Sequence, residues 1–467
     1  MTLALLIADT IHSFRQHKQW PTDGDMLFNV IPSEDMDKVL TDPLAMKVLM
    51  HDEHYLNPNR YFSHLAVQEY CWNVPLLLQR FTTPIDSVYL SQAILKTVNQ
   101  LALIFLLAAF VVPFRKIWSI EFLLCALLVT PFFQTFGYNG QMGIIDRSTT
   151  YDFFYSFPIV FVMLFFLPVI RAMSHKEFRL TPLTQIFMLA CAFIASFSGP
   201  LNLGVAPVAC LAVIFFLLKA KGNQEISLVK RFVQIPKSVL IPLMFFLLCC
   251  AYSLFINAKA GTMAEDVPPL LTRYALCLEG LWQTLTIKIG LGWLLGLIVL
   301  NLTLIQYKLK SDEATSILRL SKWIGICILI YLFLLPLGGY RSYRGLIVRN
   351  DTFMPVTLAL FWIYVQSAFF IISTYKTKFR FSYYFVIIYS SVLFTQYDKL
   401  ADAGHECEKK MMQEIAASKE TIVKLSEPCP LLDWHIYTDY KDSEKASQLL
   451  LHWNVIKEKK LFYHPAE

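Results

Sequence analysis

Charged residues are scarce in this sequence. They make up 16% of its 467 residues, whereas soluble domains contain about 25%. Hydrophobic residues reach 56% and the mean hydropathy is +0.49. The apolar residues form long uninterrupted runs instead of the amphipathic pattern of a soluble core. These features exclude an ordinary soluble domain and predict an all-α polytopic membrane protein, a helical transmembrane bundle.

A paired-cysteine motif is also lacking. The sequence has 10 cysteines, and none forms a C-x-x-C pair, which excludes zinc ribbons and thioredoxin-like redox sites. Most of them lie in apolar runs, where cysteine acts as a small hydrophobic residue. Cys407 and Cys429 differ, because both lie in the polar C-terminal tail. They can form a disulfide if the tail faces an oxidising compartment, and the sequence leaves this open.

The first residues lack the features of a secretory signal peptide. "MTLALLIA" is apolar up to Asp9, but no basic segment precedes it and no small-residue cleavage site follows it. A helix of this length extends about 12 Å, which is less than a membrane span needs. Residues 1–13 are therefore either an incomplete first transmembrane helix or a short amphipathic anchor.

Ten apolar runs are long enough, or nearly so, to cross a hydrocarbon layer of about 30 Å. Their approximate ranges are 87–113, 118–136, 153–170, 181–197, 202–218, 238–256, 284–306, 323–338, 353–374 and 381–396. The sequence thus predicts about 10 or 11 spans, with the transmembrane bundle at residues 87–396. Glycines and prolines interrupt residues 197–207, which predicts either a tight outer turn or a broken helix buried by its neighbours.

Basic residues concentrate in every second connection between these runs. One such connection holds Lys219, Lys221, Lys230, Arg231 and Lys237. Because basic connections stay on the cytoplasmic side, residues 14–86 and 397–467 are predicted to face outward from a bacterial cytoplasmic membrane. We expect the first to be an outer loop with interfacial helices and the second to be a small helical region.

The stretch "HDEHYLNPNRYFSH", residues 51–64, contains enough histidine and acidic residues to suggest a metal site. A zinc-protease helix needs two histidines four residues apart with glutamate after the first. Here Asp52 follows His51, and His54 comes too early. Pro58 would also end a helix quickly. We therefore expect a loop in which the histidines make hydrogen bonds, without a metal or another cofactor.

Acidic residues of the first loop are candidates for a general base. They are Asp23 and Asp25 in "TDGDM", and Asp52 and Glu53 in the stretch 51–64. His54 and Arg60 of the same stretch are candidates for binding a substrate.

Two later segments expected at the outer face combine glycine with charge. "GIIDRSTTYDFFYSFP" contains Asp146 and Arg147, and "GGYRSYRGLIVRNDTFMP" contains Arg341, Arg344 and Arg349. The planar fork of arginine binds phosphate well, so a lipid phosphate or a pyrophosphate is an expected partner. The alternative is contact with ordinary phospholipid head groups or pairing with acids of the first loop.

The sequence resembles the glycosyltransferase C superfamily over nearly the whole chain. The resemblance lies in the helix count, the acidic first outer loop, the later outer arginines and the small outer C-terminal region. The segments quoted above also resemble parts of bacterial membrane proteins. The superfamily resemblance implies transfer of a sugar from a polyprenyl-phosphate donor, with a first-loop carboxylate as base and basic residues holding the carrier phosphate. It implies membrane lipids and the lipid-linked sugar as partners, and no nucleic acid.

Carried onto this sequence, the resemblance implies Asp25 or Asp52 as the base and Arg341 with Arg344 as the phosphate clamp. In the superfamily the key acid follows the first helix closely, and that helix is incomplete here. Asp23 and Asp25 fit the position, and Asp52 and Glu53 are rivals.

Two other classes of function stay open. A transporter or flippase for a lipid-linked or anionic substrate should carry ionisable residues deep in its spans. The sequence offers Glu279 and Lys288 near the inside of a run, with Lys96 and Glu121 nearer to the ends, which favours a surface site. A noncatalytic partner in envelope polysaccharide assembly is the third class.

Overall fold

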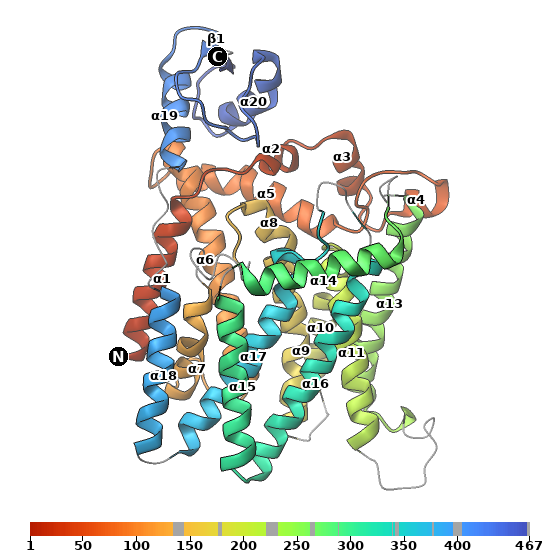
Figure 1. Ribbon diagram of the computed structural model, residues 1–467. Helices are drawn as coiled ribbons and strands as arrows, with labels where there is room; N and C mark the ends of the chain where they lie inside the picture. Colours follow the sequence, from red (N-terminus) through yellow and green to blue (C-terminus); the bar gives the residue numbers. More distant parts are fainter. Residues whose placement is uncertain are drawn as a thin grey trace.

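The computed structural model describes residues 1–133, 144–175, 180–220, 232–261, 267–287, 289–338, 340, 345–375, 378–395 and 404–464. Long helices run side by side, and short helices with a small C-terminal unit cover one end of them (Figure 1). We call this end of the bundle the cap end.

Among the described residues, seven helices are long and apolar enough to cross a membrane. They are α6 (Pro84–Val111), the continuous helix of α8 (Thr149–Tyr151), η3 (Asp152–Ser156) and α9 (Phe157–His175), α11 (Pro200–Ala220), α13 (Lys237–Lys259), α15 (Gly290–Lys308), α16 (Asp312–Leu334) and α17 (Asn350–Thr374). Shorter apolar helices are α7 (Ile120–Val129), α10 (Pro182–Ser196) and α18 (Lys378–Thr395), and the 3-10 turns η1 (Thr130–Phe132) and η4 (Leu335–Leu337) extend α7 and α16. Each predicted apolar run overlaps one of these helices, and the prediction of an all-α, multi-pass membrane protein is confirmed.

Local sequence signals set where several of these helices begin. The Thr83 hydroxyl accepts a hydrogen bond from the Asp86 N–H at 3.2 Å, and Pro84 takes the first position of α6. A serine or threonine caps other helices in the same way, at Ser119, Thr181 and Ser311. Such caps satisfy backbone groups that the first helical turn leaves unpaired.

One helix departs from the direction of the bundle. α14 (Leu270–Thr286) lies across the long helices near the cap end (Figure 1). Leu271, Leu278 and Trp282 share its outward face and are 83%, 67% and 67% exposed. The predicted span 284–306 begins too early, because α15 begins at Gly290. Glu279, expected near the inside of a span, lies on an exposed face of α14.

The first loop folds into short helices at the cap end. They are α2 (Gly24–Val30), α3 (Glu34–Thr41), α4 (Met46–His51) and α5 (Tyr61–Leu78), preceded by α1 (Thr2–Lys18), which packs along α6 and α7. All of these helices after α1 fall in residues 14–86, for which the sequence predicted helices.

The connection between α10 and α11 is a tight turn, which decides between the two alternatives for residues 197–207. The Gly199 N–H donates to the Asn59 carbonyl at 3.1 Å, and the Phe62 N–H donates to the Phe197 carbonyl at 3.0 Å. Gly199 has a φ of 116°, which a side chain would disfavour. The first loop therefore fastens this turn to the cap end.

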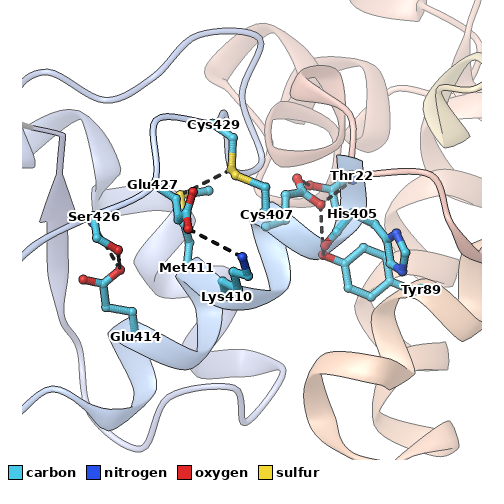
Figure 2. Close-up of a disulfide and its surroundings, with 11 residues drawn as sticks. Thr22, Tyr89, His405, Cys407, Lys410, Met411, Glu414, Ser426, Glu427 and Cys429 are labelled. Atoms are coloured by element: carbon cyan, nitrogen blue, oxygen red, sulfur yellow. Dashed lines mark hydrogen bonds and ion pairs between the residues drawn. A yellow bond between two sulfur atoms is a disulfide. The ribbon is translucent and has the colours of Figure 1, made fainter. Parts of the chain in front are cut away.

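Residues 404–464 form a small unit that we call the cap. It contains α19 (Gly404–Ala417), η5 (Tyr440–Ser443) and α20 (Glu444–His452), together with β1 (Ile422–Lys424) and β2 (Leu461–Tyr463), which pair in parallel. The prediction of helices alone was incomplete, because strands this short leave no alternating pattern in the sequence. A disulfide joins Cys407 and Cys429 (Figure 2), so the pairing that the sequence left open is present.

Three apolar clusters hold the described parts together. The largest lies among the long helices, the second joins the first loop to the cap, and the third joins the first loop to the ends of α10 and α13. In the second, Met26 and Val30 of α2 pack with Met411, Leu432 and Trp453 of the cap, and each is at most 1% exposed. Burial of each large side chain contributes about 1.5–3 kcal/mol, so the cap and the first loop share one core.

Candidate functional site

The acidic pair of the stretch 51–64 lies beside the end of α13. The Asp52 carboxylate is 2.7 Å from the Lys259 ammonium, and its side chain is 78% exposed. The hydrogen bond from Lys259 holds the pKa of Asp52 below its usual range. The His54 Nδ1 lies 3.1 Å from the Ala260 carbonyl oxygen, and Glu53 follows Asp52 in the same turn. These contacts tie the first loop to α13.

Asp25 lies beneath the cap. Its Oδ1 accepts a hydrogen bond from the Trp434 indole N–H at 3.2 Å. At the neighbouring Gly24, a Cβ would lie only 2.4 Å from the Trp434 backbone nitrogen. The close approach requires glycine at this position and places Asp25 at the contact between α2 and the cap.

Asp23 is 4% exposed and is held by Thr150. Its carboxylate accepts hydrogen bonds from the Thr150 N–H at 3.1 Å and the Thr150 hydroxyl at 2.7 Å. Burial raises the pKa of this carboxyl, and the bonds from Thr150 oppose the rise. Asp23 therefore fastens the first loop to α8.

Two arginines predicted to bind substrate lie over aromatic rings. The Arg147 guanidinium carbon is 4.6 Å from the centre of the Trp20 ring. The corresponding distance from Arg60 to Phe154 is 5.3 Å. Stacking of this kind contributes about 0.5–2 kcal/mol and fixes the plane of the guanidinium.

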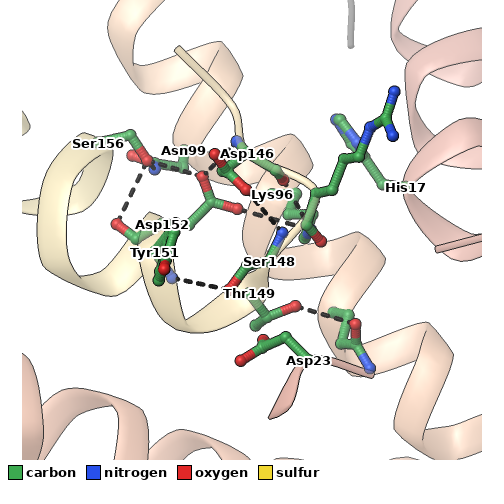
Figure 3. Close-up of polar contacts among 12 residues, drawn as sticks. His17, Asp23, Lys96, Asn99, Asp146, Ser148, Thr149, Tyr151, Asp152 and Ser156 are labelled. Carbon is green, nitrogen blue, oxygen red and sulfur yellow. Dashed lines mark hydrogen bonds and ion pairs between the residues drawn. The ribbon is translucent and has the colours of Figure 1, made fainter. Parts of the chain in front are cut away.

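A buried polar network lies where α6 meets α8 (Figure 3). Lys96 is 0% exposed, and its ammonium donates to the Asp146 carbonyl oxygen at 2.8 Å and to the Arg147 carbonyl oxygen. It also lies 3.8 Å from the Asp152 carboxylate. Asp152 in turn accepts hydrogen bonds from the Asp146 N–H at 3.1 Å and the Ser156 hydroxyl at 2.9 Å.

More side chains extend this network along α6. Hydrogen-bonded pairs are Gln92 with Thr149, Asn99 with Ser156, and His17 with Gln100. Asp152 also begins a π-helical turn, a conformation common at functional sites. The structure corrects the expectation that Lys96 lies nearer to an end of its span, since α6 runs from Pro84 to Val111.

The segment held by Lys96 forms part of the wall of a cavity of about 330 Å³. The other walls come from the inner face of α14 and from the start of α17. The lining residues are Asp146, Tyr151, Gly280, Gln283, Thr284, Ile287, Leu346, Val348, Arg349, Asn350 and Asp351. The cavity therefore joins two segments that the sequence analysis had singled out separately.

Opposite charges meet at this cavity. The Arg349 guanidinium pairs with the Asp351 carboxylate, with one nitrogen 2.5 Å and another 3.2 Å from its oxygens. Asp146 accepts a hydrogen bond from the Ser148 N–H at 2.8 Å, and burial raises the pKa of its carboxyl. A carboxyl of raised pKa can exchange a proton with a bound hydroxyl group, and a guanidinium can bind an anion.

The structure brings together some of the predicted residues and leaves others apart. Asp146 and Arg349 line the cavity, whereas Asp23, Asp25, Asp52, Glu53, His54, Arg60 and Arg147 are not among its lining residues. Arg341 and Arg344 lie outside the described residues.

Sequence reasoning missed other residues of this site. Asp351 lies within the arginine segment, two residues after Arg349, and Lys96 is an isolated cation in an apolar run, so the sequence itself marks both. Gln283 and Tyr151 left none, because the sequence does not show that α14 crosses the bundle beside α8.

Within the described ranges, no group of three or more His, Cys, Asp or Glu side chains is arranged to hold a metal ion. Searches for similar proteins found no matching family model, curated protein or solved structure. The cavity and its charged walls are therefore the basis for inferring what the protein does.

Proposed function

We propose that this protein is a membrane glycosyltransferase that transfers a sugar from a polyprenyl-phosphate donor to an acceptor at the cavity lined by Asp146 and Arg349. The supporting observation is that one cavity holds both a carboxyl and a guanidinium. The reaction needs a group that takes a proton and a group that stabilises the departing phosphate. Apolar spans with a folded first loop and a cap at one end also agree with the architecture of the glycosyltransferase C superfamily.

Helix α14 supports a donor that is linked to a lipid. Gly280, Gln283 and Thr284 on its inner face line the cavity, while Leu278 and Trp282 on its outward face are exposed. A helix that lies across the spans with an exposed apolar stripe suits the membrane–water interface. A phosphate in the cavity would then lie at the depth of lipid head groups, with its prenyl chain in the bilayer.

The cap end faces outward from a bacterial cytoplasmic membrane in this proposal. The turn between α15 and α16, the C-terminal end of α17 and the N-terminal end of α18 lie at the opposite end (Figure 1). Both connections, α15 to α16 and α17 to α18, belong to the set that is richer in lysine and arginine, which membrane insertion retains in the cytoplasm.

The proposed reaction assigns the base to Asp146, whereas the sequence pointed to Asp25 or Asp52. The acceptor hydroxyl oxygen attacks the anomeric carbon of the sugar, and the Asp146 carboxylate takes the hydroxyl proton. The bond between that carbon and the phosphate oxygen breaks, and its electron pair leaves with the polyprenyl phosphate. Arg349 stabilises this phosphate by donating to it a hydrogen bond that it otherwise donates to the Asp351 carboxylate. Arg341 and Arg344 complete the clamp as sequence-based proposals.

Asp146→Asn tests the assignment of the base. The full-length protein in lipid nanodiscs, supplied with a panel of polyprenyl-phosphate sugars and candidate acceptors, should lose about 100-fold in transfer rate. Asp37→Asn, an exposed first-loop substitution, is the matched control and should keep the wild-type rate. Full activity of Asp146→Asn together with loss in Asp25→Asn or Asp52→Asn would return the base to the first loop.

Lipid analysis of a strain without this protein tests the proposed activity itself. A lipid-linked sugar should accumulate, and its structure would identify the donor. If no such lipid accumulates and the wild-type protein transfers no sugar from any donor of the panel, the proposed activity is wrong.

A flippase for a lipid-linked substrate is the second candidate. The observation that favours it is the pair Lys96 and Asp152, since buried ionisable residues within long apolar helices commonly mark a transport path. Proteoliposomes that contain a fluorescent polyprenyl-phosphate sugar distinguish the two. Movement of the lipid across the bilayer without its consumption would favour the flippase, and consumption without movement would favour the transferase.

A further inference from the structure

The backbone of Asp146 is held from two sides. On one side the Lys96 ammonium binds the Asp146 carbonyl oxygen at 2.8 Å and the next carbonyl oxygen, that of Arg147. On the other side the Asp152 carboxylate accepts the Asp146 N–H at 3.1 Å. Figure 3 shows Lys96 and Asp152 meeting at this backbone. The contacts leave the Asp146 side chain to line the cavity.

The burial of Lys96 indicates that these contacts are a specialised arrangement. Removing an ammonium from water costs several kcal/mol unless it is paired and hydrogen-bonded. The ammonium has three donors, and here they face two carbonyl oxygens and a carboxylate 3.8 Å away. Methionine or leucine would fit an apolar helix at no such cost. The acceptor groups of this segment therefore offset the cost of burying the Lys96 ammonium.

The segment held in this way forms one side of the cavity. Asp146 and Tyr151 both line it, and Asp152 lies directly after Tyr151 at the start of the π-helical turn. Asp146 is also fixed locally, because its Oδ1 accepts the Ser148 N–H at 2.8 Å. Movement of the backbone at Asp146 would thus change the distance between its carboxyl and Arg349.

We propose that Lys96 and Asp152 are positioning residues that clamp the backbone of residues 146 and 147 and so hold the Asp146 carboxyl in place in the cavity. The role in catalysis rests on the proposed function, whereas the clamp itself does not. Neither residue needs to touch the substrate. Lys96 also favours the charged form of Asp146, because its ammonium attracts that carboxylate.

Hydrogen–deuterium exchange tests the clamp without any substrate. In Lys96→Met, with the full chain in nanodiscs, exchange of backbone amides in residues 144–151 should rise by about tenfold or more. The double variant Lys96→Met/Asp152→Asn should show the same rise without leaving an unpaired buried charge, which covers the case in which the single variant does not fold. Lys38→Met, at a half-exposed ion pair of the first loop, is the control and should leave this segment unchanged. Wild-type exchange in the folded variants would overturn the clamp.

The pH profile of sugar transfer tests whether the clamp acts on Asp146. Lys96 and Arg147 lower the pKa of this carboxyl, and Asp351 raises it. Lys96→Met should raise the pKa of Asp146 and move the acid limb of the profile to higher pH by about half a unit or more. A loss of stability alone would not move the acid limb of the profile. An acid limb in Lys96→Met at the same pH as in the wild type would therefore overturn the positioning role.

The two readouts separate failure of the clamp from failure of the proposed function. A rise in exchange in the variants, without transfer by the wild-type protein, would leave the clamp standing and remove the transferase. Transfer by the wild-type protein, with unchanged exchange in the variants, would remove the clamp and leave the transferase.

Discussion

At the scale of single residues, Glu408 makes a buried polar contact between the cap and the first loop. Its carboxyl accepts hydrogen bonds from the Thr22 N–H at 2.8 Å, the Thr22 hydroxyl at 2.5 Å and the Tyr89 hydroxyl at 2.9 Å. Burial raises the pKa of Glu408 from 4.5 to about 7. The cost of burying its charge exceeds the gain from these bonds, so folding shifts Glu408 towards its neutral form.

This pKa predicts how the stability of the cap depends on pH. Between 4.5 and about 7 the folded protein binds more protons at Glu408 than the unfolded chain, so the contribution of Glu408 to stability falls as the pH rises through this range and is constant above it. The measurement is the difference between the thermal unfolding temperatures at about pH 5 and about pH 8. Relative to the wild type, Glu408→Gln should shift this difference in favour of stability at pH 8, because glutamine stays neutral.

Glu420→Gln is the control for this measurement, because Glu420 is exposed. It should keep the wild-type difference between the two pH values. An equal difference in Glu408→Gln and in the control would show that Glu408 does not titrate in this range.

At the scale of elements, Gly280 allows α14 to approach the segment before α17. A Cβ at Gly280 would lie 2.9 Å from the Val348 carbonyl oxygen and 3.0 Å from the Val348 Cβ. Val348 directly precedes Arg349, and both line the cavity. The fit between these two elements thus sets the width of the cavity on the side of the guanidinium.

We predict that Gly280→Ala lowers the stability of the protein by about 1–3 kcal/mol through overpacking and weakens binding of polyprenyl phosphate. Gly292→Ala, in α15, is the matched control, since a Cβ there meets nothing within 4 Å. It should be neutral or stabilising by up to about 1 kcal/mol. Melting temperature and equilibrium binding in nanodiscs measure both effects. Equal results for the two variants would exclude a role for this close contact.

At the scale of the whole molecule, the orientation in the membrane is open to a direct test. Glu458→Cys places a thiol in the cap at a side chain that is 69% exposed. Lys116→Cys places one at an exposed position in the connection between α6 and α7. In intact spheroplasts, a membrane-impermeant maleimide should label the cap thiol and should label position 116 only after lysis. The opposite pattern would reverse the proposed orientation.

The whole molecule also shows which features a sequence can reveal. The spans were predictable because each needs one long apolar run, and caps such as Thr83 mark their starts. α14 was not, since Leu271, Leu278 and Trp282 are spaced along one face and form no run. The cavity was not predictable either, because only the packing of the bundle brings Asp146 and Arg349 to the same place.

The shared core of the cap and the first loop also constrains the order of assembly. Met26 and Val30 of α2 complete their packing with Met411, Leu432 and Trp453, and the entire bundle lies between these residues in the chain. During synthesis, α2 therefore emerges from the ribosome before the bundle is inserted into the membrane, and the cap emerges after it. The apolar face of α2 therefore lacks its partner residues of the cap until the last helix of the bundle has been inserted.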